Sequence, residues 1–225
     1  MLRKLFTIEA TRNQVFPLKN SITAMIAPRP GPAAGRAQFV CTGPSCRTQA
    51  NAAPGILNRS YRILAEIVVP QSGANGMLVT QGGRFAGWGL YLKEGKLVFR
   101  MNLLNLERVR WEAPDALPPR KHKVVVDFTI DRAGTIPFGH GGTGMLLVDD
   151  REVARNSMKR STPFSFAWDK TFDVGHDTGT PVDDKDYQVP FAFTGTLGKL
   201  TVDLGEGTVT PEAVNAFLAG AAKRD

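Results

Sequence analysis

Apolar residues occupy every second position in several short segments of this chain, and turn residues separate these segments. In residues 60–69 the apolar residues at positions 61, 63, 65, 67 and 69 alternate with Arg62, Leu64, Glu66 and Val68. Residues 88–92 and 97–101 repeat the alternation on either side of a Glu94-Gly95 turn. A period of two places alternate side chains on opposite faces of a strand, and the short turn is typical of a tight hairpin. The pattern therefore predicts antiparallel strands with a buried face.

Further strands are predicted at about eight- to twelve-residue intervals, a spacing typical of sandwiches and jelly rolls. They cover residues 77–81, 109–111, 122–130, 145–148, 152–155 and 199–204. The glycine-rich run 139–144 is interpreted as a turn that leads into one of them. With 225 residues, the chain is long enough for one substantial core. The fold class predicted is all-β, a concanavalin A-like jelly-roll sandwich, with a closed barrel as the alternative.

Both ends of the chain depart from the strand pattern. Residues 2–10 have apolar side chains at helical spacing, which predicts a short helix. Prolines and glycines recur through residues 17–54 and break regular elements, so this stretch is interpreted as a long arm over the core, or else a free linker. Thr210 and Pro211 are typical of a helix start, and an amphipathic helix is expected to follow and to dock on the sandwich. We therefore expect an arm at 1–58, a sandwich at 59–204 and a helical tail at 205–225.

The chain is basic, with 28 Lys and Arg against 21 Asp and Glu and a formal charge of +7. These basic residues are spread widely rather than clustered, so no nucleic-acid partner is predicted. No run of about eighteen apolar residues occurs, so neither a transmembrane helix nor a membrane partner is predicted. The basic start lacks the apolar region of a secretory signal, which predicts a cytoplasmic protein as written. Cys41 and Cys46 are then expected to be reduced, with a disulfide as the alternative after export.

An acidic, glycine-containing stretch near the end of the predicted sandwich is the first candidate site. Asp173, Asp177 and Asp183 are the candidate metal ligands, because calcium prefers carboxylate and carbonyl oxygens supplied by loops. The spacing does not match an EF-hand loop. The alternative is that these carboxylates stabilise turns and solvated loop tips.

Three other residues are candidates for ligand binding. Arg84, beside Gly82 and Gly83, could bind a sulfate or carboxylate through its guanidinium group and nearby backbone donors. Trp88 could form an aromatic platform for a sugar, although its alternation with Leu90 favours a place in the core. His176 could contact a ligand, but the sequence shows neither a partner nor a pocket for acid–base catalysis.

Several segments together resemble a known family. GGRFAGWGLYLKEGKLVF, LPPRKHKVVVDFTID, GHGGTGMLLVDDREVA, TFDVGHDTGTPV and FTGTLGKLTVDL resemble, in the same order, the C-terminal accessory domain of long bacterial arylsulfatases. The resemblance covers about residues 59–204, and residues 2–36 resemble the connection out of the sulfatase domain. It implies a concanavalin A-like sandwich. It also implies a parent family that is often periplasmic or secreted.

The sulfatase catalytic motif, C-x-[PS]-x-R, has no match here. Cys41 is followed by a proline one position too late, and Cys46 is followed immediately by an arginine. No catalytic residue of the family is therefore carried over to this chain. The resemblance favours a non-catalytic accessory or interaction domain for a sulfatase catalytic domain. The alternatives are a standalone binder of sulfated or acidic carbohydrate, and arylsulfatase activity transferred from the family.

Overall fold

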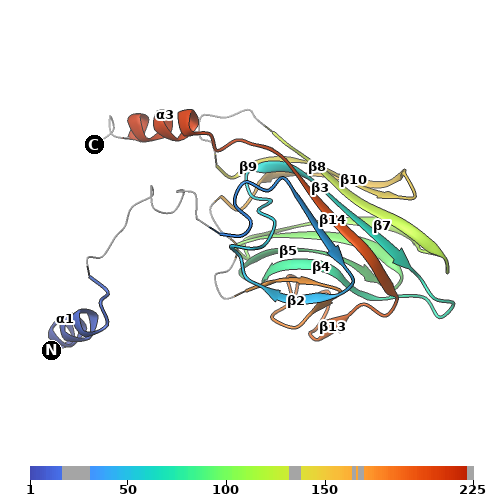
Figure 1. The fold of residues 1–225 in the computed structure, drawn as a ribbon, viewed down its shortest axis with the longest axis horizontal. Coiled ribbons are helices and arrows are strands. Elements are labelled where there is room, and N and C mark those ends of the chain that lie inside the picture. Colours follow the sequence, from blue (N-terminus) through green and yellow to red (C-terminus); the bar gives the residue numbers. More distant parts are fainter. Residues whose placement is uncertain (17–30, 132–137, 164–165, 167–169, 222–225) are drawn as a thin grey trace.

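Two β-sheets packed face to face form the body of the protein (Figure 1). The computed structural model describes residues 1–16, 31–131, 138–163, 166 and 170–221. The six-stranded sheet has the order β1 (Gln38–Thr42), β14 (Thr196–Gly207), β3 (Arg59–Val68), β8 (Lys121–Ile130), β9 (His140–Val148) and β10 (Arg151–Arg160). These strands are antiparallel throughout.

The second sheet carries the candidate site described below. Its main path is β12 (His176–Asp177), β13 (Phe191–Ala192), β4 (Gly76–Gly83), β5 (Ala86–Lys93), β6 (Lys96–Leu103) and β7 (Glu107–Ala116). Beside this path, β11 (Phe172–Val174) pairs with β4 and with β2 (Ser45–Thr48). The predicted all-β sandwich is confirmed.

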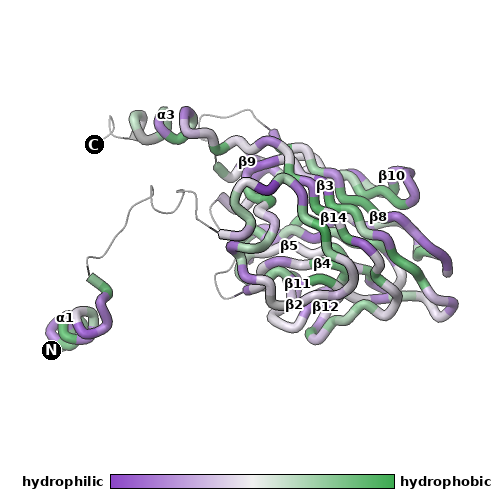
Figure 2. Tube along the Cα trace, viewed as in Figure 1, coloured by the Kyte–Doolittle hydropathy of each residue, from purple (hydrophilic) through white to green (hydrophobic). Residues whose placement is uncertain are grey.

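The core lies between the two sheets and is built from the residues that the alternation places inward. Trp88 is fully buried there, with its ring centroid 6.2 Å from that of Phe99. Within the six-stranded sheet, Tyr61 of β3 stacks on its register partner Phe128 of β8, with 5.0 Å between ring centroids. Figure 2 shows the same arrangement as apolar stretches along the central strands, with polar residues at the loops. Burial of large apolar side chains on both inner faces is the main stabilising contribution in such a sandwich.

The glycine-rich run 139–144, predicted as a turn, belongs mostly to strand β9. Two of its glycines leave room for aromatic rings that pack against the strand. A Cβ on Gly142 would lie 2.5 Å from the Phe128 ring, and one on Gly144 would lie 3.0 Å from the Trp111 indole. Real Cβ atoms essentially never approach other atoms to 2.5 Å and rarely to 3.0 Å, so glycine lets these two rings pack against the strand backbone.

The proline- and glycine-rich stretch also contains regular structure, contrary to the prediction. β1 pairs with β14, and β2 pairs with β11. Phe39 is the buried residue of β1, and Cys41 packs partly against the core, which is too little to produce a visible alternation. Such short strands depend on hydrogen bonds to a neighbour rather than on their own pattern. The first part of the proline- and glycine-rich stretch, residues 17–30, lies outside the described residues.

Both predicted helices are present, as α1 (Leu2–Arg12) and α3 (Pro211–Ala221). The Thr210 hydroxyl accepts a hydrogen bond from the Ala213 amide at 3.2 Å, which confirms Thr210 as the N-cap of α3. The Phe217 ring of α3 meets Phe138 edge-on, with 5.6 Å between centroids. Among the described residues, no helix is both long and apolar enough to cross a membrane.

Candidate functional site

The outer face of the second sheet carries a group of arginines. In β6 and β7 the large apolar residues Phe99 and Trp111 point into the core, so the alternate positions point outward. Those outward positions include Arg100 on β6 and Arg108 and Arg110 on β7. The strand register sets Arg100 directly opposite Arg110. Adjacent like charges need nearby carboxylates, and a loop supplies them.

The segment between β12 and β13, residues 178–190, lies over this outer face. It adds a second, smaller apolar cluster to the molecule, made of Met77, Tyr91, Val98 and Tyr187 with Phe191 packed beside them. Tyr187 stacks on Phe191 at 4.7 Å between ring centroids and also meets the Tyr91 ring at 5.3 Å. These ring contacts fix the loop against the sheet and bring its acidic residues to the arginines.

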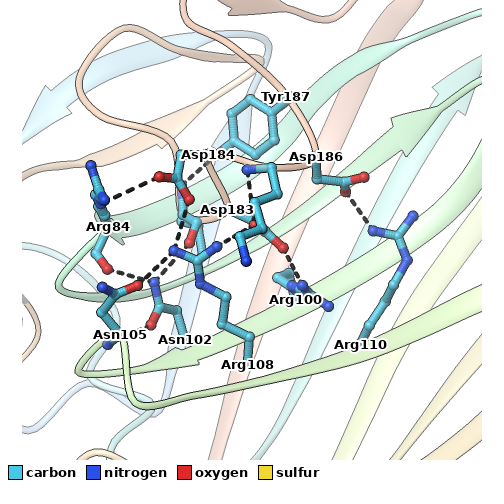
Figure 3. A network of polar contacts seen from close by, with 12 residues as sticks. Arg84, Arg100, Asn102, Asn105, Arg108, Arg110, Asp183, Asp184, Asp186 and Tyr187 are labelled. Carbon is cyan, nitrogen blue, oxygen red and sulfur yellow. Dashed lines mark hydrogen bonds and ion pairs between the residues drawn. The ribbon is translucent and has the colours of Figure 1, made fainter.

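Asp183 is the central carboxylate of the polar network in Figure 3. It pairs with Arg100 on one side, and on the other it accepts a hydrogen bond from Arg108 at 2.5 Å. The Asp183 side chain is 1% exposed, so the two guanidinium groups replace its lost hydration. Its oxygen also accepts from the Lys185 amide at 3.1 Å. Asp183 therefore holds the loop to the sheet.

Asp186 makes the second attachment of the loop. Its carboxylate pairs with Arg110 at 2.5 Å and accepts a hydrogen bond from the Tyr91 hydroxyl. Burial on its own would raise the pKa of Asp186, but the hydrogen bonds from Tyr91 and Arg110 outweigh it and lower the pKa below its ordinary value. Burial, followed by the nearby Asp186 carboxylate, raises the pKa of the Tyr91 hydroxyl, which therefore stays protonated as the donor.

Beyond these attachments the network opens into a solvent-exposed groove of about 550 Å³. The residues that line it are Arg84, Arg100, Asn105, Leu106, Arg108, Asp184 and Lys185. They come from the β4–β5 hairpin, the β6–β7 hairpin and the loop after β12. Asn102 ties these segments together, because its amide donates to the backbone oxygens of Arg84 at 2.7 Å and of Val182 at 2.8 Å (Figure 3).

Asp184 lies between two of the cations in this groove. It is 3.3 Å from the Arg84 guanidinium and 2.8 Å from that of Arg108 (Figure 3). The hydrogen bond from Arg108 lowers the pKa of Asp184, so the carboxylate is ionised at neutral pH. A guanidinium presents several donors in one plane and binds carboxylate, sulfate or phosphate oxygens equally well. Asp184 thus occupies a place that suits the acidic group of a ligand.

The three predicted metal ligands are distributed over different contacts. Asp183 is paired with arginines, as described above. Asp177 accepts hydrogen bonds from the Tyr187 hydroxyl at 2.7 Å and from the Gly179 amide at 3.1 Å. Asp173 accepts one from the Thr171 hydroxyl at 2.9 Å. Within the described part of the chain, no three His, Cys, Asp or Glu residues gather in a way that could hold a metal ion. Calcium binding stays a prediction.

The predicted ligand-binding residues have different surroundings. Arg84 lines the groove. Trp88 is buried in the core, where its indole donates a hydrogen bond to the Gln81 side chain at 3.3 Å. It therefore packs in the core, which was the alternative to a sugar-binding platform. His176 is partly buried on β12 and does not line the groove.

Sequence reasoning missed Arg100, Arg108 and Lys185 as groove residues. The alternation of β6 and β7 is a signal that could have placed Arg100 and Arg108 on one outer face. Lys185, on an irregular loop, has no such signal. The arrangement offers donors for an anion, and none of the residues that line the groove is a histidine, cysteine or serine nucleophile.

Comparison with known proteins gives matches among solved structures alone. No protein-family model matches the chain, and no curated protein matches it. The resemblance to arylsulfatase C-terminal domains is therefore not confirmed and stays a prediction.

Three of the similar solved structures differ in source and coverage. Domains LG4-5 of the mouse laminin α1 chain are 15% identical over 84% of this chain, with a TM-score of 0.49, and this chain spans about half of that one, 48%. The CBM40 of Ruminococcus gnavus IT-sialidase, bound to α2,3 sialyllactose, is 13% identical, covers 81% and 96% of the two chains and has a TM-score of 0.47. The binding domain of botulinum neurotoxin DC, in complex with SialylT, is 11% identical to this chain and has a TM-score of 0.47. The match covers 81% of this chain and 42% of the neurotoxin chain. The fold assignment rests on the two hydrogen-bonded sheets themselves.

Proposed function

We propose that this protein is a non-catalytic binding module that holds an acidic carbohydrate, sulfated or carboxylated, in the groove beside Arg84 and Arg108. The observation that carries the proposal is the open groove of about 550 Å³ with three arginines in its wall. An open groove of this volume has room for part of a polar sugar chain. Its guanidinium groups supply paired donors for the acidic group of the ligand, and Asn105 supplies an amide for a hydroxyl group.

Asp184 acts in this proposal as an internal substitute for the ligand. Its pair with Arg84 is long, at 3.3 Å, and its side chain is exposed enough to turn away into solvent. An acidic ligand then takes its place between Arg84 and Arg108. Asp183 keeps Arg108 oriented throughout, because that pair is buried. Competition from Asp184 lowers the affinity for the ligand without changing the shape of the groove.

A panel of soluble glycans at low salt tests the proposal directly. We expect sulfated or carboxylated glycans to bind and their neutral counterparts to fail. Arg84→Met is expected to weaken binding about tenfold, since a charge-assisted hydrogen bond contributes about 1.5–3 kcal/mol. Arg62→Met is the matched control, because Arg62 is a similarly exposed, ion-paired arginine on the other sheet. Equal loss in both variants would mean that net charge, rather than the groove, attracts the ligand.

Asp184→Asn provides a gain-of-affinity test. Removing the competing carboxylate is expected to strengthen binding of the acidic glycan several-fold, since the asparagine amide no longer attracts Arg84 and Arg108. Asp150→Asn removes the same charge from an exposed residue that pairs with Lys123 on the six-stranded sheet. That control is expected to leave affinity unchanged. A loss of affinity in Asp184→Asn would refute the role of Asp184 as a substitute for the ligand.

A second candidate function is an accessory domain for a sulfatase catalytic domain, as the family resemblance implies. The observation in its favour is α1, which exposes Leu2, Leu5, Phe6 and Ile8 to solvent. Apolar helix faces of this kind usually pack against a partner. Co-purification with a sulfatase-domain protein, lost in a Leu5→Ser, Phe6→Ser variant, is the expected result. An unchanged monomer in the presence of that domain would count against this function.

Arylsulfatase activity of the chain alone is the least supported alternative. The catalytic cysteine motif has no match in the sequence. We expect the purified protein to leave an aryl sulfate unhydrolysed. Turnover that survives replacement of both cysteines would contradict the assignment as a binding module.

A further inference from the structure

Two neighbouring hairpin tips at the mouth of the groove carry an unusual set of exposed apolar side chains. Phe85, on the β4–β5 tip, is 68% exposed, while Leu104 and Leu106, on the β6–β7 tip, are 48% and 77% exposed. The tips are neighbours because β5 and β6 pair, with Gly87 opposite Asn102. Asn102 also joins them directly, through its hydrogen bond to the Arg84 carbonyl. Three large apolar groups therefore share one end of the sandwich.

Leu104 is held in this place at a conformational cost. Its φ is +51° and that of Asn105 is +58°, and the Leu106 amide bonds to the Leu103 carbonyl at 2.8 Å. Positive φ at both central residues is the pattern of a type I′ hairpin turn, in which asparagine and glycine are favoured. At 48% exposure, the leucine side chain is only about half covered there. Backbone strain of this kind, kept at an exposed position, points to a function for the side chain.

The surroundings of the tips are cationic. Arg84, Arg108 and Lys185 lie in the groove immediately behind them, together with Arg100. Asp183 and Asp184 balance two of these four cations, and Glu107 on the same hairpin pairs with Arg160, so positive charge is in excess. The apolar groups project from turns, whereas small ligands bind in concave pockets. Convex apolar tips backed by cations match the interface of a bilayer, where apolar groups enter the acyl boundary and cations stay among anionic headgroups.

We propose that the Phe85 and Leu104–Leu106 tips dock the protein on an anionic lipid surface. Phe85, Leu104 and Leu106 enter the interfacial region, and the exposed Arg84 and Lys185 contact the acidic headgroups. The lack of a spanning helix in the described part of the chain does not bear on a surface of this kind, because peripheral docking needs only a few apolar side chains and nearby charge. The inference shares Arg84 with the proposed glycan function, and the groove would then open toward the membrane.

Co-sedimentation with lipid vesicles tests the proposal. We expect the full chain to bind vesicles of 70% phosphatidylcholine and 30% phosphatidylserine and not to bind vesicles of pure phosphatidylcholine. Binding to the anionic vesicles should weaken several-fold between 0.1 and 0.5 M salt. Phe85→Ser with Leu104→Asn is expected to lower the partition at least tenfold, because two apolar groups no longer enter the interface. Val40→Ser with Val68→Asn is the matched control, since these valines are exposed on the six-stranded sheet, and it should bind like the natural sequence.

A loss of folding is separated from a loss of docking by the melting temperature. Asparagine tolerates positive φ better than leucine, so Leu104→Asn alone should melt at the same or a higher temperature while binding vesicles less. Glycerophosphoserine, a soluble headgroup, should leave vesicle binding intact. The proposal is overturned if the natural protein ignores the anionic vesicles, if the tip variant binds as well as the control, or if the soluble headgroup displaces the protein. Retained binding of a soluble acidic glycan by the tip variant shows that the groove is intact.

Discussion

The buried pairing of Asp183 makes the strongest prediction about stability. Asp183→Asn removes a carboxylate that is 1% exposed and leaves Arg100 and Arg108 without their shared partner, although their side chains are only 16% and 14% exposed. Removing one member of a buried ion pair costs about 3–5 kcal/mol, because the remaining charge keeps its desolvation penalty. For a protein of this size each kcal/mol shifts the melting temperature by about 2–4 °C. We therefore expect a decrease of roughly 6–20 °C.

Thermal and urea denaturation of Asp183→Asn and Asp127→Asn together check this reasoning. Asp127 pairs with Arg62 at 2.8 Å on the six-stranded sheet, with side chains 30% and 41% exposed. An exposed pair of this type contributes about 0–1 kcal/mol. The two variants remove the same group but differ in burial and in their partners, which are two arginines for Asp183 and Arg62 for Asp127. Equal destabilisation by both, within about 1 kcal/mol, would refute the claim that the arginine pairs hold the loop to the sheet.

Three other predictions concern pH, packing and metal. Burial raises the pKa of Asp177, so ionisation of its carboxyl group reduces the stability of the fold as pH rises above the ordinary aspartate range. The loss of stability caused by Asp177→Asn should therefore shrink from pH 4 to pH 7 in unfolding titrations. The pKa of Asp186 is lowered, so the penalty of Asp186→Asn should instead be present at pH 7 and shrink as pH falls; parallel pH profiles would disprove both assignments. Gly144→Ala should cost about 1–3 kcal/mol, because a Cβ would lie 3.0 Å from the Trp111 indole, whereas Gly55→Ala, with open space around it, should melt unchanged. If calcium binds through Asp173, Asp177 and Asp183, added calcium should raise the melting temperature and a chelator should reverse the rise; no shift would remove that prediction.

Strand positions were the most predictable part of the molecule. The two-residue period identified the inward face of β3, β5, β6 and β8, because the residues that face the core are apolar at every second position. The glycine run in β9 misled the prediction because glycine signals a turn and a close packing contact equally well. Only the neighbouring Phe128 and Trp111 rings distinguish these two roles.

The helix start at Thr210 and the burial of Trp88 could be predicted from local order, because a cap and an alternating strand are set by residues a few positions away. The groove could not. Arg100 and Asp183 are 83 positions apart in the printed sequence, and their meeting depends on how the loop after β12 folds over the second sheet. Acidic residues follow no periodic pattern that would reveal their partners. An aspartate in the sequence is therefore equally consistent with a metal ligand, a solvated loop tip or an arginine partner. The packing of Tyr187 on Phe191 and Tyr91 fixes the loop against the sheet and so places Asp183 beside the arginines.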